Sequence, residues 1–328
     1  MQTPAPVVAR HCSRPWKQIT FLSDGEAVCS CVDVAKTMPL GNVNELSMEE
    51  IWNGPAYKSL RQDCIEDISR RPVCTTCPNR IPEAPKNPEN LDVEHRPRHA
   101  YIETVAACNL VCPGCDREAI EGSRNGARMS VDTFKKIIDG LSPHLEYLEY
   151  HVGGENWAHK QSAEMLRYAK ANNPYLFTLT STNGLYFNTE AQRRDALLSG
   201  IDVIIMSIDG ATAESYDRYR VRGDFNQVVE NMRAMIKMRE EMHVSWPKIV
   251  WRYILFNWND SDEEMNMARE MAKEMGVDWL TWLLDVAPTD EYTSRRFRHG
   301  SPELEEIRHE MWETVQGMIP VAPRWEDY

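Results

Sequence analysis

Three cysteines lie close together in the middle of the chain, in the segment Cys108-Asn-Leu-Val-Cys112-Pro-Gly-Cys115. Three thiolates at this spacing can hold a 4Fe-4S cluster and leave one iron without a protein ligand, where a substrate can bind. A ferredoxin-like fragment or part of a zinc knuckle is an alternative for the triplet alone. The lack of a fourth cysteine nearby and the strand predicted just before the triplet favour an enzyme.

The other six cysteines fall within the first 80 residues, and the chain has none after Cys115. They are Cys12, Cys29, Cys31, Cys64, Cys74 and Cys77. The total of nine is odd, which a fully paired disulfide framework would not give, so metal binding is the better interpretation. A structural zinc site, which two cysteine pairs can form, is the alternative for this first group.

The elements that must position the triplet alternate between predicted strands and amphipathic helical stretches. The predicted strands are 101–105, 147–152, 176–180, 203–208, 249–256 and 279–284. Strands joined by helices run parallel through right-handed crossovers. Six such units are too few for a closed eight-unit barrel, so we expect an α/β fold with a partial barrel or an open doubly wound sheet. Ligands collect at the carboxyl ends of the strands, where the triplet falls.

The first 80 residues predict short, turn-rich elements. Residues 16–22 predict a strand, which a turn at Ser23-Asp24-Gly25 connects to a hairpin partner at 27–34. Residues 47–62 predict a helix that Ser47 and Glu50 begin with a capping box and that Gly54-Pro55 interrupts. At the other end of the chain, residues 302–315 predict a terminal helix.

The triplet and the motifs that follow it resemble the radical S-adenosylmethionine (SAM) superfamily over roughly residues 99–285. The resemblance implies a partial (βα)6 barrel of the radical SAM type, in which Cys108, Cys112 and Cys115 ligate a 4Fe-4S cluster. It also implies the reaction: the reduced cluster passes one electron to SAM, which breaks into methionine and a 5'-deoxyadenosyl radical. That radical takes hydrogen from an unactivated carbon of the substrate.

Three later segments carry the expected SAM contacts. Gly153-Gly154-Glu155 resembles the family's glycine-rich turn, which holds the amino group of methionine and needs small residues because the backbone approaches the ligand. Asn183 is a candidate at the end of the third barrel strand. Ser207 and Arg220 are candidates for the SAM ribose or carboxylate, because a hydroxyl and a guanidinium suit those groups. A capping serine and a solvated arginine are their ordinary alternatives.

The sequence departs from the family pattern at one position. Gly114 stands before the last cysteine, where many members place an aromatic residue near the adenine. The adenine contact is therefore left unassigned, while the three thiolates and the glycine-rich turn are intact.

The first 80 residues resemble a SPASM or twitch domain, a module that holds an auxiliary iron-sulfur cluster. The landmarks, in order, are Arg14-Pro15-Trp16, Asp24-Gly25, Cys29 with Cys31, Leu40-Gly41-Asn42-Val43, Glu50-Ile51-Trp52, and Cys74 with Cys77. In most relatives this module follows the barrel, whereas here it precedes the barrel. We therefore expect a small Cys-rich auxiliary-cluster domain at 1–80, a Pro-rich linker at 81–98, the barrel at 99–285 and a C-terminal extension at 286–328.

The resemblance implies one auxiliary 4Fe-4S cluster, which needs four thiolates. Cys12, one of Cys29 and Cys31, Cys74 and Cys77 would supply them. Cys64 is then spare, and a spare thiol is usually a small buried hydrophobe. As a catalytic alternative, Cys64 could donate a hydrogen atom to a substrate radical.

Charge and hydrophobicity limit the expected partners and localisation of the protein. The formal charge of -13 gives little support for binding nucleic-acid phosphates. No stretch approaches the ~20 apolar residues that span a bilayer, and the first residues are too polar for a signal peptide, so we expect no membrane partner and a cytoplasmic protein. By resemblance, a flavodoxin or ferredoxin donates the electrons.

The substrate is open between three hypotheses. The first is an oxidoreductase or epimerase acting on a sugar, aminocyclitol or similar small polar molecule, because the chain is compact and has no separate peptide-docking domain. The second is a maturase that oxidises or crosslinks a ribosomally made peptide. The third is a non-catalytic iron-sulfur electron carrier, which would need no SAM site and therefore no glycine-rich turn at 153–155.

Overall fold

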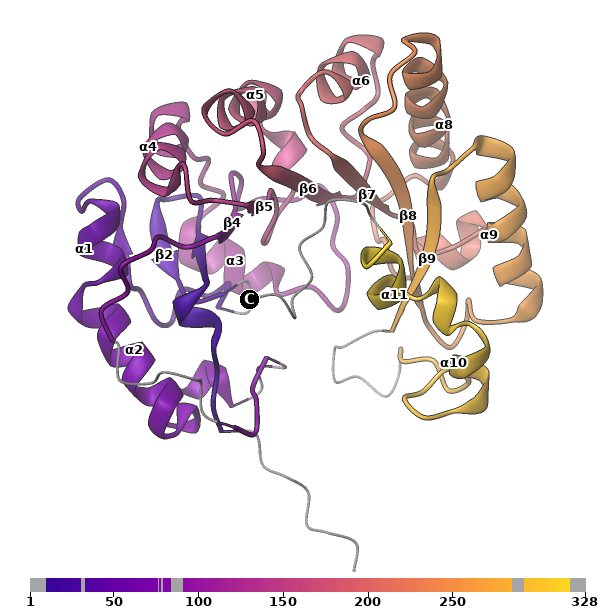
Figure 1. The fold of residues 1–328 in the computed structure, drawn as a ribbon. Helices are drawn as coiled ribbons and strands as arrows, with labels where there is room; N and C mark the ends of the chain where they lie inside the picture. The colour runs from indigo at the N-terminus through magenta and orange to yellow at the C-terminus, as the bar shows by residue number, and fades with distance from the viewer. Residues whose placement is uncertain are drawn as a thin grey trace, which may run out of the picture.

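Nine strands form one curved sheet in the computed structural model, which describes residues 10–30, 33–75, 77, 79–83, 91–284 and 292–318. In order across the sheet they are β3 (Gly41–Asn42), β2 (Glu26–Val28), β1 (Gln18–Phe21), β4 (His99–Ile102), β5 (Tyr147–Glu149), β6 (Phe177–Thr182), β7 (Val203–Ser207), β8 (Lys248–Leu255) and β9 (Trp279–Leu284). Figure 1 shows the strands arranged in an open arc.

The six strands predicted from residue 101 onward are confirmed as β4 to β9, each paired in parallel with the next. The helices between them are α3 (Arg117–Arg124), α4 (Val131–Leu141), α5 (Ser162–Asn172), α6 (Glu190–Leu197), α7 (Ala213–Asp217), α8 (Phe225–Glu241) and α9 (Asp262–Met275). Helices α4, α5, α6, α8 and α9 lie along the outer side of the arc (Figure 1). The fold is therefore the expected α/β partial barrel.

The amino-terminal segment contributes three strands and several short helices. The helical elements are η1 (Arg14–Trp16), α1 (Met48–Trp52), α2 (Pro55–Glu66), η2 (Ile68–Arg70) and η3 (Pro72–Cys74). The capping box of Ser47 and Glu50 is confirmed at the start of α1, and the chain breaks at Gly54 before α2 begins. The second hairpin strand is shorter than predicted and ends at Val28. A turn follows, in which the Asp33 carboxylate accepts hydrogen bonds from the backbone N–H of Thr37 at 2.8 Å and of Met38 at 2.9 Å.

Strand β1 pairs in parallel with β4, from Gln18 opposite His99 to Phe21 opposite Ile102. The sequence predicts a hairpin partner for β1 but gives no sign of this second pairing. The sheet therefore runs without a break from the cysteine-rich segment into the barrel. The division of the chain at 80, 98 and 285 stays a prediction.

The two faces of the sheet bury different clusters, because successive residues of a strand point to opposite sides. Leu148, Ile204 and Trp251 face the helices and belong to the main core. The opposite, inner face carries a smaller apolar cluster of Tyr147, Phe177, Leu179, Val203, Ile205 and Val250. Two residues further along each strand the same face becomes polar, at Glu149, Ser181, Ser207 and Arg252. The polar positions lie toward the carboxyl ends of the strands.

The predicted terminal helix at 302–315 is wrong as a single element. The structure has α10 (Pro302–Glu306), η5 (Arg308–Glu310) and α11 (Trp312–Gln316) instead. Glu310 accounts for the break, because its carboxylate accepts hydrogen bonds from Arg269 Nε at 2.9 Å and from Trp282 Nε1 at 2.9 Å. Much of the predicted extension, residues 286–291 and 319–328, lies outside the described residues. Among the described helices, none has the length and apolar character needed to cross a membrane.

Candidate functional site

The cysteine triplet lies in the loop between β4 and α3. Its three thiols line one pocket. Within the loop, Cys115 N donates to the carbonyl of Cys112 at 3.1 Å and Leu110 N donates to Sγ of Cys108 at 3.4 Å. Burial raises the pKa of all three thiols, that of Cys108 to about 11. The thiolate forms therefore need a cationic centre beside them, and iron supplies that charge.

The glycine-rich turn is held against the start of this loop. Glu155 N donates to the carbonyl of Ala107 at 2.9 Å. Gly154 has a φ of +66°, and a Cβ on it would lie 2.0 Å from the carbonyl oxygen of Val105. Any side chain at this position would push the turn away from the cysteine loop, so the glycine is needed for the close approach.

Glu155 and Asn183 connect the turn, strand β6 and the cysteines. The buried Glu155 carboxylate accepts from Asn183 N at 2.8 Å, from Thr182 Oγ1 at 2.9 Å and from Trp157 N at 3.2 Å. Burial raises its pKa, and these donors act in the opposite direction. Asn183 Nδ2 in turn donates to Asn109 Oδ1 at 2.8 Å and lies 3.6 Å from Sγ of Cys108.

Arg220 lies directly against the cysteine loop. Its Nε donates to Asp209 Oδ2 at 2.5 Å and its Nη1 lies 3.8 Å from Sγ of Cys112. The Arg220 side chain is 13% exposed, which disagrees with a solvated surface arginine. A guanidinium here can stabilise thiolate charge and the anionic part of a ligand at the same time.

The predicted SAM residues come together in the structure. One pocket of about 460 Å³ is lined by Cys108, Cys112, Cys115, Gly153, Gly154, Glu155, Asn183, Ser207 and Arg220. The residues fit a cluster held by three thiolates with a polar ligand beside it, because donors, acceptors and a cation all face one space. The individual roles of these residues stay predictions.

Two further residues of this pocket region were missed by the sequence reasoning. Asn109 bonds Asn183, as described above. Arg252 lies on β8, and its Nη2 donates to Ser181 Oγ at 2.5 Å and to Ser207 Oγ at 2.9 Å. The sequence does point to Arg252, because an arginine within an otherwise apolar strand is unusual unless its side chain faces a polar site. Asn109 had no comparable signal.

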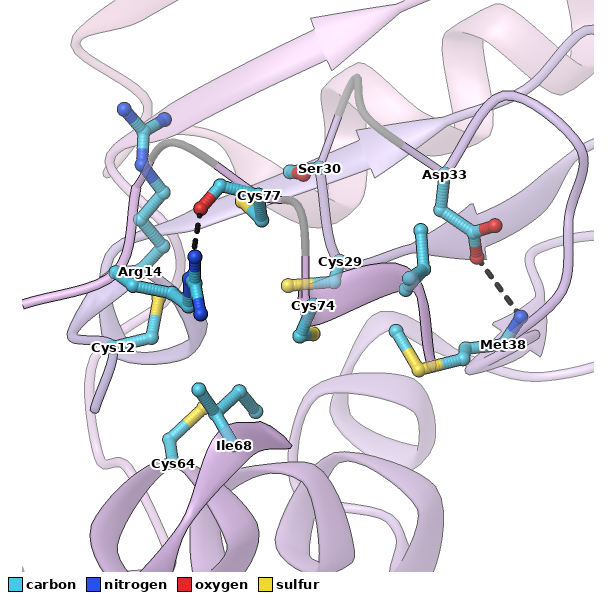
Figure 2. Close-up of a pocket in the computed structure, with 12 residues that line it drawn as sticks. Cys12, Arg14, Cys29, Ser30, Asp33, Met38, Cys64, Ile68, Cys74 and Cys77 are labelled. Carbon is cyan, nitrogen blue, oxygen red and sulfur yellow. Dashed lines mark hydrogen bonds between the residues drawn. The ribbon is translucent and has the colours of Figure 1, made fainter. Parts of the chain in front are cut away.

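The amino-terminal cysteines line a second pocket, shown in Figure 2. The cysteines around it are Cys12, Cys29, Cys64, Cys74 and Cys77. They come from the segment before η1, the end of β2, helix α2 and the region of η3. Cys31, the other candidate beside Cys29, lies outside the described residues. Four thiols suffice for a 4Fe-4S cluster, so the residues present fit the auxiliary group.

Cys64 lies beside Cys12 in this second pocket and does not line the pocket of the cysteine triplet. A hydrogen bond from the Cys64 thiol lowers the pKa of Cys12 to about 7, and the same contact raises the pKa of Cys64. The two side chains therefore act on each other directly inside this pocket. The hydrogen-donor role of Cys64 stays a prediction.

The zinc alternative for the first group requires ligands that converge on a single ion at about 2.0–2.3 Å. Within the described residues, no group of three or more His, Cys, Asp or Glu side chains is placed to hold one metal ion.

The two pockets are lined by consecutive residues at one place in the chain. Asp33 lines the second pocket, and the next residue, Val34, lines the pocket of the triplet. This place is fixed by a buried ion pair in which Arg124 donates to Glu103 through Nε at 2.8 Å and Nη2 at 2.9 Å. Arg124 also donates from Nη1 to the carbonyl of Val34. Helix α3 thereby ties the triplet loop to the amino-terminal segment.

Family models match both parts of the chain. The model of the radical SAM superfamily matches residues 102–268, which is half of the chain, and that of the SPASM iron-sulfur cluster-binding domain matches residues 12–78. The order of the two matches agrees with the order expected from the sequence, with the SPASM domain first.

Three curated relatives share part of their length with this chain. Mycofactocin maturase MftC of Mycobacterium tuberculosis is 34% identical over 133 residues, 40% of this chain and 33% of that protein. AdoMet-dependent heme synthase of Methanosarcina barkeri is 26% identical over 188 residues, 57% of this chain and 50% of that protein. PqqA peptide cyclase of Rhodopseudomonas palustris is 31% identical over 123 residues, 37% of this chain and 31% of that protein. The matches thus span a third to a half of the relatives' length.

A solved structure resembles nearly the whole chain. SuiB of Streptococcus suis bound to S-adenosylmethionine aligns with a TM-score of 0.50 at 11% identity, over 92% of this chain and 70% of that one. At this identity the likeness concerns the fold alone.

Proposed function

The chain belongs to the radical SAM superfamily, with a SPASM iron-sulfur domain ahead of the barrel, and from this premise we propose that it is a maturase that oxidises or crosslinks a ribosomally made peptide. Its cofactors are the radical SAM 4Fe-4S cluster, SAM and the auxiliary iron-sulfur cluster of the SPASM domain. When bound, the reduced SAM cluster supplies the electron that cleaves SAM and so starts radical chemistry.

The proposal of a peptide substrate rests on two relatives, one named as a maturase and one named as a peptide cyclase. The sugar or aminocyclitol hypothesis has less support, because none of the three relatives is named for such a substrate. The heme synthase match covers more of the chain at lower identity. This match makes a non-peptide substrate the alternative that the experiment below must distinguish.

Oxidation is favoured over epimerisation by where the cysteines lie. An epimerase needs a hydrogen donor beside the substrate radical, and in the described residues the only thiols lining the SAM-side pocket are those of the triplet. An oxidation needs an electron acceptor nearby, and the auxiliary pocket begins one residue from the SAM-side pocket, at Asp33 and Val34. The substrate then loses a hydrogen atom, a proton and an electron, which amounts to a two-electron oxidation.

The chain's own residues position the reacting groups. Gly154 keeps the backbone of the glycine-rich turn against the cysteine loop, and Glu155 holds the end of β6 beside it. Arg220, fixed by Asp209, places a positive charge beside Cys112.

The test is to incubate the anaerobically reconstituted protein with SAM, dithionite and peptides translated from short reading frames beside its gene. A peptide that is the substrate should raise the rate of 5'-deoxyadenosine formation. Its mass after incubation should be lower by two hydrogen atoms. The variant with Cys108, Cys112 and Cys115 all changed to Ala is the control and should do neither. Turnover of a free small molecule, with no peptide bound or changed, would overturn the proposal.

A further inference from the structure

The inner face of the barrel carries a cation, Arg252, that forms no ion pair with any described residue. Arg252 is the polar residue that follows Val250 on the inner face of β8, and it lines the SAM-side pocket. Its register partner on β7 is Ser207, and Ser181 lies on the next strand, β6. The three side chains form a polar group above the apolar cluster of the inner face.

The hydrogen bonds of Arg252 are incomplete. Nη2 uses its two hydrogens on the hydroxyls of Ser181 and Ser207, which themselves lie 3.3 Å apart. Nε is buried and has no hydrogen-bond partner among the described residues. Nη1 makes no hydrogen bond to any residue in the described part of the chain. Nη1 and the serine hydroxyls are therefore the groups left to meet a ligand.

Arg252 also forms no ion pair with a described residue. Across residues 91–284 and the other described segments, no carboxylate oxygen comes within the 4.0 Å that defines an ion pair with it. Two acidic groups act on Arg252 from beyond that distance: Asp209, which pairs with Arg220 at 2.5 Å, and the buried Glu149, whose neighbour His99 has a pKa lowered by burial. A buried guanidinium that keeps unused N–H groups and has no ion pair is stabilised when an anion binds beside it.

We propose that Arg252, with Ser181 and Ser207, binds a carboxylate of the substrate, which assigns Ser207 to the substrate instead of to the SAM contact predicted for it from the sequence. Nη1 can donate to a carboxylate oxygen in a charge-assisted hydrogen bond, and the one serine hydroxyl hydrogen that the Ser181–Ser207 contact leaves free can donate to the same carboxylate. The site would hold the substrate by a charged group on the inner face of the barrel and turn the reacting carbon toward the pocket of the cysteine triplet.

The methionine carboxylate of SAM is the other source of the same chemistry, and the placement favours the substrate. Arg220 is the cation that contacts the cysteine loop, at 3.8 Å from Cys112 Sγ. Arg252 is held by Ser181 on β6 and Ser207 on β7, and among the described residues it has no hydrogen bond to the cysteine loop. The inference applies to any substrate and so stands apart from the peptide proposal. Combined with it, the inference predicts a free carboxylate at or next to the reacting residue of the peptide.

The experiment uses reconstituted protein saturated with SAM, with ¹³C-labelled acetate as the probe and acetamide as its uncharged match. In the reduced protein, acetate bound near the paramagnetic cluster should show a ¹³C hyperfine coupling that acetamide does not give. Arg252→Gln should weaken acetate binding by roughly tenfold or more, the loss of one charged hydrogen-bonding group, while the Kd for SAM changes less than about twofold.

Two controls keep the result interpretable. Iron content and thermal unfolding report folding, and Arg252→Lys, which keeps the charge without the planar guanidinium that the two serines hold, should bind acetate between the wild type and Arg252→Gln. A Kd for SAM raised about tenfold in Arg252→Gln would assign the residue to the SAM carboxylate and overturn the proposal. Equal acetate binding in wild type and Arg252→Gln, or equal binding of acetamide, would overturn it as well.

Discussion

The guanidinium of Arg220 bridges Asp209 and Cys112, with Nε 2.5 Å from the Asp209 carboxylate and Nη1 3.8 Å from the cysteine sulfur. Asp209 follows the end of β7, and its second oxygen accepts from Ile254 N at 2.8 Å. The position of the arginine against the cysteine loop is thus set by a carboxylate that is itself fixed to β8.

Asp209→Asn should therefore weaken SAM binding while the cluster is retained. The amide keeps the bond to Ile254 N but loses the charge that holds Arg220, so we expect the Kd for SAM to rise roughly tenfold. Equilibrium binding and iron content measure the two effects. Asp195→Asn, which removes one side of the exposed pair with Arg167, is the matched control and should leave SAM binding unchanged. An unchanged Kd in Asp209→Asn would show that Arg220 needs no such support.

Gly154→Ala should lose SAM binding and stability together. The positive φ and the clash with the Val105 carbonyl force the turn away from the cysteine loop, at a cost of about 1–3 kcal/mol in unfolding free energy. Gly122→Ala is the control, because that glycine lies inside α3 with no atom near its added Cβ, so it should be neutral or slightly stabilising. Denaturant unfolding and SAM titration of both variants would test this, and equal behaviour would contradict it.

Cys64→Ala should change the auxiliary cluster without removing it. The Cys64 thiol stabilises negative charge on Cys12, so its loss should shift the reduction potential of that cluster to a more negative value. Cys64→Ser keeps a donor and should shift the potential less. Redox titration followed by EPR gives the potentials, and iron analysis gives the cluster count. Loss of a whole cluster in Cys64→Ala would instead identify Cys64 as a ligand, and altered stereochemistry of the product would favour the hydrogen-donor role.

Stability should fall as the pH is lowered from about 7 toward 5. Burial lowers the pKa of His151 from 6.5 to about 4 and lowers that of His99, while Glu149 lies 3.3 Å from His151 and 3.1 Å from His99. Between pH 6.5 and about 4, His151 is protonated in the unfolded chain but not in the folded chain. The free energy of unfolding therefore falls as the pH is lowered through this range.

The measurement for His151 is thermal unfolding of the reconstituted protein across this range, beside His151→Asn. The variant has no titrating ring at 151, so its midpoint should depend less on pH than that of the wild type. Parallel curves for the two proteins would mean that other groups, such as the cluster thiolates, set the acid sensitivity.

The sequence predicted those parts of the fold and the site that depend on local pattern. Strands β4 to β9 follow from alternating apolar runs, and the start of α1 follows from Ser47 and Glu50, which lie within one turn. The pocket follows in part, because residues just past parallel strands, such as Glu155 and Asn183, meet at one edge of the sheet.

What was missed depends on distant contacts. The pairing of β1 with β4 joins residues far apart in the sequence, and nothing in either strand specifies its neighbour. The break in the terminal helix depends on Glu310 reaching Arg269 and Trp282. The position of Cys64 beside Cys12 depends on how α2 packs against the segment before η1, which no local pattern reports.

The parallel pairing of β1 with β4 has a consequence for the architecture as a whole. A fragment containing residues 10–83 would present the bare edge of β1, and one containing residues 91–284 would present the bare edge of β4, each with unpaired backbone N–H and C=O groups. The two cluster-binding parts are therefore poor candidates for exchange as independent modules. The hydrogen-bond register between β1 and β4 fixes the distance between the two cluster-binding parts. A hinge motion between these parts would have to break the hydrogen bonds between the two strands.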